Sequence, residues 1–479
     1  MLPLLPDILL IGLAFLVLVV DIAIHGNTRG GARVIHVLAI AGLAVVALSF
    51  LFVPAGPPRV YLGAYEVDGF ARLMKLLFTL AALLTVLLAR QYFTVGGNGY
   101  KPLRNPAEFT YLLLFSTAGS FFVVSSRDLL TLFVSLELAT IPLYILSAFN
   151  RQSLLSSEAS TKYVIMGSVS TAVLLFGYSY LYGITGSVHF DDIGAFIARD
   201  PDAPLLMLSV TLVFCAAGFK LTLAPFHMWA PDVYDGAPGP VTAFLSVTSK
   251  ATAIGFLCIL FYGPFAPIRE RFIPWIIAFS ALTMVVGNLG ALRQERFLRF
   301  MAYSSIAQAG YILLALLGPS GLARTAVVYY LFIYAAANFS MFFLMAAVGQ
   351  ARGETFDALR GLSKDHPAYA GMLAAALFSL AGIPPAAGFT GKFMLFGGAA
   401  SAGHYALVVF AALNSTVSLY YYLLVMRAAY ITPAPHEDRP PVLQRRDHAF
   451  ALTALLLATL LLGLLPGVSN GIARILAGG

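Results

Sequence analysis

The stretch from residue 219 to residue 250 reads FKLTLAPFHMWAPDVYDGAPGPVTAFLSVTSK. It leaves one long apolar run and enters another, and it carries a lysine at each end, Lys220 and Lys250. Between them, Pro225 removes a backbone donor, and the Pro/Gly segment at 236–240 loosens any helix. An ionisable residue inside an apolar run marks a candidate functional site in a membrane protein. The stretch therefore predicts an interrupted membrane-spanning helix that is flanked by buried cations.

The composition of the whole chain agrees with a membrane location. Of 479 residues, 59% are hydrophobic and only 11% are charged, with a mean hydropathy of +0.85. A soluble domain carries about 25% charged residues. Since a spanning helix needs about 20 apolar residues, the chain is expected to be an all-α polytopic protein with about fourteen spans. We expect these spans near residues 4–25, 34–53, 69–89, 108–125, 128–149, 159–183, 204–225, 238–262, 272–292, 300–317, 324–349, 369–400, 405–431 and 449–465.

A second interruption lies five spans after the first. Residues 381–392 read AGIPPAAGFTGK, and Lys392 closes that stretch. Broken spans at corresponding places in two halves are typical of inverted-repeat transporters. We therefore predict two inverted five-helix repeats with breaks in spans 7 and 12. The expected units are three N-terminal spans at 1–107, a first repeat at 108–265, a second repeat at 266–432, and a final span with its tail at 433–479.

The distribution of Lys and Arg predicts how the chain is oriented. With the N-terminus outside, sixteen of these residues fall in cytoplasmic loops and seven in outer loops. Positive charge accumulates on the cytoplasmic side of membrane proteins, and an even number of spans returns the C-terminus outside. The N-terminal apolar run lacks a basic leader and reads as a retained span. The amphipathic segment DDIGAFIARD at 191–200 is expected to lie along the surface.

Three lysines and one glutamate fall in the middle of predicted spans. A carboxylate such as Glu137 costs about 2.5–3.5 kcal/mol at the centre of a bilayer helix. It could instead be kept neutral, or hold two helices together through a hydrogen bond. One of the lysines could be a structural counter-ion, but Lys220, Lys250 and Lys392 lie on three separate spans with one central carboxylate to share. A desolvated lysine can exist in either protonation state, which suits a proton carrier.

Other ionisable residues lie nearer the ends of spans. Glu158 precedes Lys162 by four residues, the favoured order for a helical ion pair, so the two form either a surface pair or part of a proton path. His227 follows Pro225 and either relays protons or marks the interface. Arg72 and Lys75 lie within two turns of the outer end of span 3, and their side chains are expected to reach up to the membrane surface.

Several function classes are excluded by what the sequence lacks. Both cysteines, Cys215 and Cys258, lie in apolar runs, and the eight histidines show no metal-ligand spacing. Neither a G-x-x-x-x-G-K-[ST] nor a G-x-G-x-x-G motif occurs, so no ATP, NAD or flavin site is expected on this chain. The net charge of +7 comes from loop arginines and does not indicate a nucleic-acid partner. Any redox chemistry is expected on another subunit.

At these residues the chain resembles a known family, the antiporter-like membrane subunits of respiratory complex I. The resemblance rests on SSRDLLTLFVSLELATIPLYILSAF, on SSEASTKYVIMGSVSTAVLLFGYSYLYGITGS, on the 219–250 stretch, on MAYSSIAQAGY and on SLAGIPPAAGFTGKF. It continues across nearly the whole chain. It implies a proton-translocating role in a bacterial inner membrane with both termini periplasmic, next to another antiporter-like subunit and small membrane subunits. FMN, iron–sulfur clusters and quinone are then expected on other subunits.

The resemblance also implies roles for individual residues. Glu137 and Lys220 would form a gating pair, Lys250 would be the central proton carrier, and Lys392 the terminal one. Glu158 and His227 match positions that the family associates with proton entry and connection. One departure occurs in QERFLRFMAYSS, where Leu298 replaces the usual lysine and Arg299 is kept. We therefore expect polar side chains, with Tyr303, Ser304 and Ser305 nearest in sequence, to bridge Lys250 and Lys392.

Two other functions fit the same residues. A subunit of a multisubunit cation/proton antiporter would share the fold and the Glu–Lys pair. A structural membrane scaffold would treat the ionisable residues as relics, which three separate buried lysines disfavour.

Overall fold

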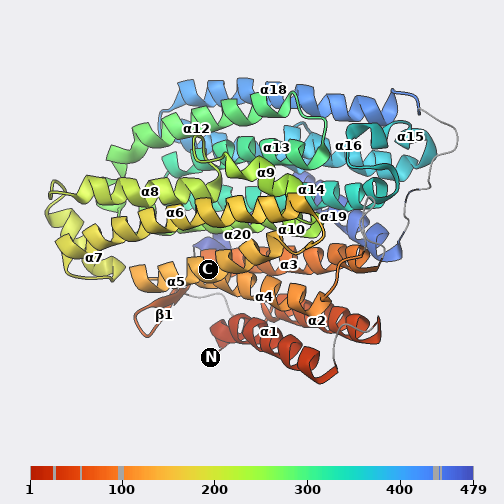
Figure 1. The fold of residues 1–479 in the computed structure, drawn as a ribbon. Helices are drawn as coiled ribbons and strands as arrows, with labels where there is room; N and C mark the ends of the chain where they lie inside the picture. Colours follow the sequence, from red (N-terminus) through yellow and green to blue (C-terminus); the bar gives the residue numbers. More distant parts are fainter. Residues whose placement is uncertain are drawn as a thin grey trace.

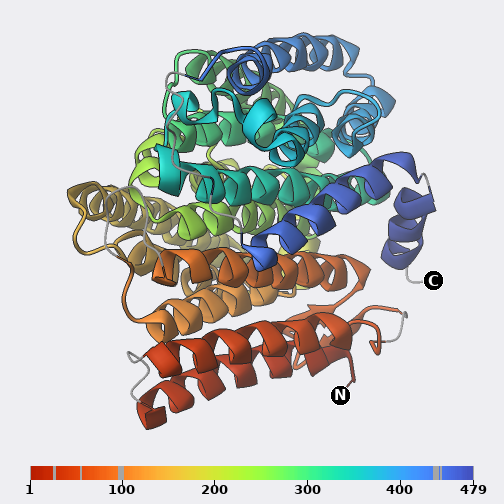
Figure 2. The same ribbon diagram turned by 90° about the vertical axis from the view of Figure 1, so that its right-hand side faces the viewer.

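The computed structural model describes residues 2–24, 29–53, 57–94, 102–434, 442, 445–465 and 467–477, and most of these lie in helices. The long helices run side by side in a stack that follows the chain. Helices α1 and α2 form one edge of the stack, and α12 and α18 lie at the opposite edge (Figure 1). The last helices return across the stack toward the N-terminal part (Figure 2).

The N-terminal part contains the one hairpin found among the described residues. A short 3₁₀ turn, η1 (Leu2–Leu4), leads into α1, and β1 and β2 pair antiparallel between α2 and α3. The elements are α1 (Leu5–Ile24), α2 (Arg29–Ser49), β1 (Arg59–Tyr61), β2 (Tyr65–Val67) and α3 (Gly69–Thr94).

The next segment contains the first broken helix and a π-helical turn, η2. Its elements are α4 (Pro106–Val123), α5 (Leu129–Ser147), α6 (Leu154–Thr185), α7 (Phe190–Arg199), α8 (Leu206–Leu221), α9 (Trp229–Gly236), α10 (Gly239–Phe244), η2 (Leu245–Ser249) and α11 (Lys250–Tyr262).

The remainder contains the second broken helix and the final span. Its elements are η3 (Ala266–Ile268), α12 (Arg269–Ala291), α13 (Phe297–Leu313), η4 (Leu314–Leu317), α14 (Ser320–Arg352), η5 (Phe356–Leu359), α15 (Leu362–Asp365), α16 (Pro367–Ala381), α17 (Ala387–Ser401), α18 (Tyr405–Tyr430), α19 (Arg446–Leu464) and α20 (Gly467–Leu476).

Both predicted breaks are confirmed. The backbone leaves the helix between α8 and α9 and again between α16 and α17, at the proline-containing segments. Among the described residues, 11 helices are long and apolar enough to cross a membrane, and the halves Leu206–Leu221 and Pro367–Ala381 are shorter apolar helices. The count of fourteen spans stays a prediction. The segment at 191–200 is helical, as expected, and α7 lies at one end of the long helices (Figure 1).

The two predicted repeats begin with the same helix–helix contact. A Cβ on Gly119 of α4 would lie 2.2 Å from the backbone nitrogen of Ala139 in α5, and one on Gly287 of α12 would lie 2.3 Å from that of Ala307 in α13. Serines support both contacts, since Ser116 donates to the carbonyl of Ala139 at 2.6 Å and Ser280 donates to that of Gly310 at 2.7 Å. Small residues allow such close approach between membrane helices. The two halves thus share this contact, and the repeat boundaries at 108–265 and 266–432 stay a prediction.

The centre of the stack is built from α13, α14 and the α10–η2–α11 segment. Their side chains are almost wholly buried within the protein, whereas most of the surface of α1, α6, α18 and α19 is left for lipid or neighbouring chains. Lys250 begins α11 within this central group.

The two ends of the stack differ in charge. We call one end the arginine face; it carries the ends of α3 and α14 and the α5–α6 and α12–α13 turns, with Arg104, Arg151, Arg293, Arg296 and Arg352. The opposite end, the hairpin face, carries the β-hairpin and α7. The first and the last described helices both reach the hairpin face, because Asp7 of α1 contacts the hairpin and Ile475 of α20 packs on Gly69 at the start of α3.

The prediction that the Lys75 side chain reaches the membrane surface is wrong. Lys75 is 1% exposed, and its ammonium lies 2.8 Å from Asp7 of α1 and 2.8 Å from the hydroxyl of Tyr65 in β2. Tyr65 also donates to Asp7 at 2.5 Å. A carboxylate within reach lets the ammonium stay buried, so the pair ties α1, the hairpin and α3 together. Arg72 is partly exposed, as expected, and donates to the carbonyl of Phe50 at 2.7 Å.

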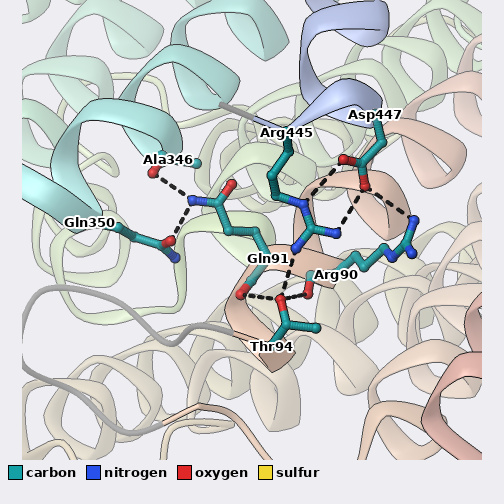
Figure 3. A network of polar contacts seen from close by, with 7 residues as sticks. All are labelled: Arg90, Gln91, Thr94, Ala346, Gln350, Arg445 and Asp447. Atoms are coloured by element: carbon teal, nitrogen blue, oxygen red, sulfur yellow. Dashed lines mark hydrogen bonds and ion pairs between the residues drawn. The ribbon is translucent and has the colours of Figure 1, made fainter. Parts of the chain in front are cut away.

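A second polar network fastens the final span at the arginine face (Figure 3). Gln91 near the end of α3 donates to the carbonyl of Ala346 in α14 at 2.9 Å. Arg445, just before α19, donates to Thr94 at 2.8 Å and pairs with Asp447, which also accepts from Arg90 at 3.2 Å. These contacts join three helices that are far apart in the sequence.

Replacing Lys75 with Met should lower the stability of the protein sharply. Removing one partner of a buried ion pair leaves the other charge unpaired and costs about 3–5 kcal/mol. The double variant Lys75→Met/Asp7→Leu should recover most of the loss, as measured by melting temperature in detergent. A single variant as stable as the wild type would contradict the buried pair.

Candidate functional site

Lys250 lies where two irregular backbone segments meet. The π-helical turn η2 ends directly before it, and its ammonium donates to Thr222 Oγ1 at 2.7 Å, inside the α8–α9 break. Thr222 has a positive φ of 61°, and the break is tied further by Ser249, whose hydroxyl donates to the carbonyl of Lys220 at 3.3 Å. Single π turns are frequent at functional sites in helices. The sequence placed Lys250 in its span but did not reveal the π turn or the threonine.

Lys392 has the corresponding position at the second break. It lies in the second turn of α17, and its ammonium donates to the carbonyl of Ala381, the last residue of α16, at 3.0 Å. It also donates to Ser415 Oγ of α18 at 2.9 Å and lies 4.6 Å from the centre of the Tyr311 ring. A cation at a helix C-terminus is favoured by the helix dipole. Both breaks therefore bind a lysine.

Lys220 differs from the other two lysines. It lies in the last turn of α8 and is 6% exposed, and its ammonium has no hydrogen-bond partner among the described residues. Glu137 of α5 is half-buried and accepts from Thr171 Oγ1 of α6 at 2.8 Å. Within the described part of the chain, Glu137 and Lys220 form no ion pair within 4 Å. The predicted gating pair is therefore apart in this structure.

Buried hydroxyl groups surround Ser304 and Ser305 of α13, as the sequence predicts. Ser305 of α13 lies 2.8 Å from the hydroxyl of Tyr334 and 3.3 Å from that of Tyr234, and Tyr334 donates to the carbonyl of Ser246 at 3.2 Å. We call these four residues, together with Ser304, Gln308, Tyr330 and Tyr422, the polar chain. Ser304 lies 2.6 Å from the hydroxyl of Tyr422. Tyr303 instead packs on Gly290.

The second part of the polar chain runs toward Lys392. Gln308 accepts a hydrogen bond from Tyr330 and donates to Tyr422 at 3.4 Å and to the carbonyl of Leu380 at 3.1 Å. The rings of Tyr330 and Tyr334 stack with centres 6.4 Å apart, which brings the two parts together. Sequence analysis missed these tyrosines and Gln308 because an aromatic or amide residue in an apolar span is typical of ordinary core packing.

A line of ion pairs crosses the arginine face. Lys162 pairs with Glu158 at 2.7 Å, as the spacing predicts, and with Asp232 of α9 at 2.6 Å. Arg299 pairs with Asp232 at 3.2 Å and approaches Asp235 to 4.0 Å. Glu158 is more than half exposed, so it lies at the edge of the protein. Arg299 therefore supplies positive charge to α9, while Leu298 beside it is buried and apolar.

His227 lies within the α8–α9 break and is partly exposed, and its Nδ1 has no hydrogen-bond partner among the described residues. Its neighbour Met228 is strongly exposed, so this part of the break lies at the outer surface of the chain. In the part of the chain that the structure describes, no group of three His, Cys, Asp or Glu residues is arranged to hold a metal ion.

The family model described as "NADH:quinone oxidoreductase/Mrp antiporter, TM" matches residues 126–418, which include both breaks and the lysines Lys220, Lys250 and Lys392. The chain belongs to this family. A protein named NADH-quinone oxidoreductase subunit N from Moorella thermoacetica is 39% identical over 449 residues, which cover 92% of this chain and 90% of that protein. The protein of the same name from Rhodospirillum rubrum is 36% identical over 437 residues, which cover 90% and 88%.

Solved structures agree with the family. A chain of respiratory complex I from Thermus thermophilus with bound aureothin matches with a TM-score of 0.82 at 33% identity, over 99% of this chain and 100% of that one. A chain of the Mrp complex from Dietzia sp. matches with a TM-score of 0.83 at 24% identity, over 99% and 97%. The second match shows the shared fold alone.

Replacing Thr222 with Val should destabilise the protein by about 1–3 kcal/mol, because the buried Lys250 ammonium would lose its acceptor. Thr222→Ser keeps the hydroxyl and is the matched control. Melting temperatures of the purified protein should separate the two variants. Equal melting temperatures would mean that the hydroxyl does not hold Lys250.

Proposed function

We propose that this chain is the subunit-N-type membrane subunit of a bacterial NADH-quinone oxidoreductase and that it carries protons across the membrane. One observation carries the proposal. Lysines bind at both helix breaks, and a buried polar chain runs between them. The opening LLPDILL and the run LNSTVSLYYYLLVMR resemble subunit N in particular, and the similar proteins of that name extend over nearly the whole chain.

The proposed relay uses the predicted site residues in order. Glu137 approaches Lys220 and stabilises its charged form, and separation of the pair frees a proton to move toward Lys250. At an effective dielectric near 20, two charges about 5 Å apart attract by about 3 kcal/mol, enough to bias one proton transfer. The proton passes along the polar chain to Lys392. Glu158 and His227 would serve entry and connection.

The proposed setting follows from charge and family. The arginine face would lie on the cytoplasmic side of the inner membrane, with the hairpin face and both termini periplasmic. An adjacent antiporter-like subunit and small membrane subunits would cover part of the exposed apolar surface. FMN, iron–sulfur clusters and quinone would lie on other subunits, since this chain contributes only the proton path. Co-purification of the chain with iron–sulfur subunits would test this assignment.

A second candidate is a subunit of a multisubunit cation/proton antiporter. It is favoured by the match to the Mrp complex, whose fold this chain shares. The two candidates differ in the energy source for proton movement, because an antiporter subunit exchanges cations without NADH oxidation. Cation-dependent proton movement in vesicles that lack any NADH–quinone activity would support this second function.

Replacing Lys250 with Arg should impair proton pumping nearly as much as Lys250→Met. Arginine keeps the charge but effectively never loses its proton, so it cannot pass one on. Proton pumping and NADH–quinone activity would be measured in native membranes. Normal pumping by the Arg variant would make Lys250 a fixed counter-charge and would contradict the relay.

Glu137→Gln should impair pumping more than Glu137→Asp. Glutamine still accepts a hydrogen bond from Thr171 but has no charge, whereas aspartate keeps the charge and withdraws it by one methylene. The same membrane assay compares them. Equal defects would instead favour a structural hydrogen bond between α5 and α6.

A further inference from the structure

A small cavity of about 60 Å³ lies at the arginine face, away from the three lysines. It is formed where the end of α3, the α5–α6 turn, the end of α9, the start of α13 and the segment after α14 come together. Polar and charged groups make up much of its wall. Residues that line it include Tyr92, Ser153, Asp235, Arg296, Leu298 and Glu354, and we call it the Asp235 cavity.

Asp235 has one free carboxylate oxygen. Its side chain is only 6% exposed, and its Oδ2 lies 3.0 Å from Arg296 and 4.0 Å from Arg299. Its Oδ1 is buried and has no hydrogen-bond partner among the described residues. A buried carboxylate oxygen without a partner is costly, so a water molecule or a proton is the natural ligand for it.

Charges around the cavity do not balance. The line of ion pairs on the arginine face contains three cations, Lys162, Arg296 and Arg299, and three anions, Glu158, Asp232 and Asp235. Glu354 adds a fourth carboxylate, and it forms no ion pair within 4 Å inside the described ranges. Leu298 supplies no charge at the wall. Among the residues that line the cavity, Asp235 and Glu354 are carboxylates and Arg296 is a cation, and a second carboxylate beside one arginine favours binding of a proton.

Glu354 is held in place although it lies in a loop. Its carbonyl accepts from the backbone of Phe297 at 2.9 Å, and the next residue, Thr355, pairs with Arg296 in an isolated β-bridge. Burial raises the pKa of Glu354, Arg296 partly offsets this, and nearby Asp235 raises it further. The two carboxyl groups thus share a cavity and one arginine.

The helix that carries Asp235 also carries one end of the polar chain. Asp235 follows Tyr234 on α9, and the Tyr234 hydroxyl begins the series that continues through Ser305 and Tyr334. Tyr334 donates to the carbonyl of Ser246, one helical turn before Lys250. Hydroxyl groups and water pass protons without holding a net charge. One short helix, α9, therefore carries both the free carboxylate and the hydroxyl at this end of the polar chain.

We propose that the Asp235 cavity is a proton-uptake port for the polar chain, with Asp235 as the inner proton acceptor and Glu354 as the outer one. This inference rests on the proposed function and adds an entry that bypasses Glu137 and Lys220. A hydronium ion gives its proton to the Glu354 carboxylate and leaves as water, and Glu354 passes that proton through water in the cavity to Oδ1 of Asp235 and returns to the carboxylate. The Asp235 carboxylic acid then passes that proton to the polar chain and returns to the carboxylate.

The test compares variants of the intact complex in native membrane vesicles. Asp235→Asn keeps the shape but removes the acceptor, and we expect proton pumping to slow about a hundredfold, the lower end of the range for loss of a proton-transfer group. Asp235→Glu should keep most of the rate, and Glu354→Gln should slow pumping without affecting assembly. Asp357→Asn is the matched control, because Asp357 is an exposed carboxylate on the same face outside the cavity, and it should pump normally.

A double variant separates uptake from a role as counter-ion. Asp235→Asn/Arg296→Gln restores the local charge balance, so a mere counter-ion to Arg296 would show recovered pumping, whereas a port would stay slow. Recovery in the double variant, or wild-type pumping by both Asp235→Asn and Glu354→Gln, would overturn the proposal. Lys250→Arg runs beside them as a reference. If Lys250→Arg pumps normally, the proposed function itself fails. If Lys250→Arg is impaired but Asp235→Asn and Glu354→Gln both pump normally, the port alone fails.

Discussion

The structure depends on the free-energy cost of leaving a peptide group without a hydrogen bond inside a bilayer. Inside a membrane no water is available to the carbonyls that a broken helix leaves free, and each unsatisfied group costs several kcal/mol. Here side chains from neighbouring helices fill that need. Lys392 and Ser415 both donate to the carbonyl of Ala381, and Ser249 donates to that of Lys220. The breaks can exist because polar groups bind them, and those same groups bring ionisable side chains to the middle of the membrane.

Prediction from the sequence succeeded where a residue determines the structure of its own segment. Proline and glycine act on their own backbone, so both interruptions could be located from residues 219–250 and 381–392 alone. The amphipathic pattern at 191–200 likewise predicted α7. Ser304 and Ser305 were expected to line a polar region because they lie in a span between two lysines, and their hydrogen bonds to tyrosines confirm this. The repeat boundaries and the roles of the site residues stay predictions.

Long-range contacts could not be predicted in the same way. In the sequence, helix α2 and the hairpin lie between α1, which carries Asp7, and α3, which carries Lys75, so nothing near Lys75 indicated a carboxylate within reach. Tyr334 and Tyr422 read as core aromatic residues, because only the packed structure shows that their hydroxyls meet serines. The sequence did not indicate a buried carboxylate at Asp235 for another reason. It lies in a segment rich in proline and glycine that was interpreted only as an interruption, and its burial depends on loops from four other parts of the chain.

The buried lysines are not equivalent, and the difference bears on how a proton could move between them. Lys75 has a carboxylate, Lys250 a hydroxyl, and Lys392 a carbonyl and a hydroxyl within hydrogen-bond distance. Lys220 has no such partner among the described residues, so its charged form is the least stabilised by fixed groups. A proton leaves a site readily only if the stability of the charged form can change. Lys220 is the lysine whose charged form depends most on an approaching partner. The partner that we propose is Glu137, which is half-buried on α5 and accepts a hydrogen bond from Thr171.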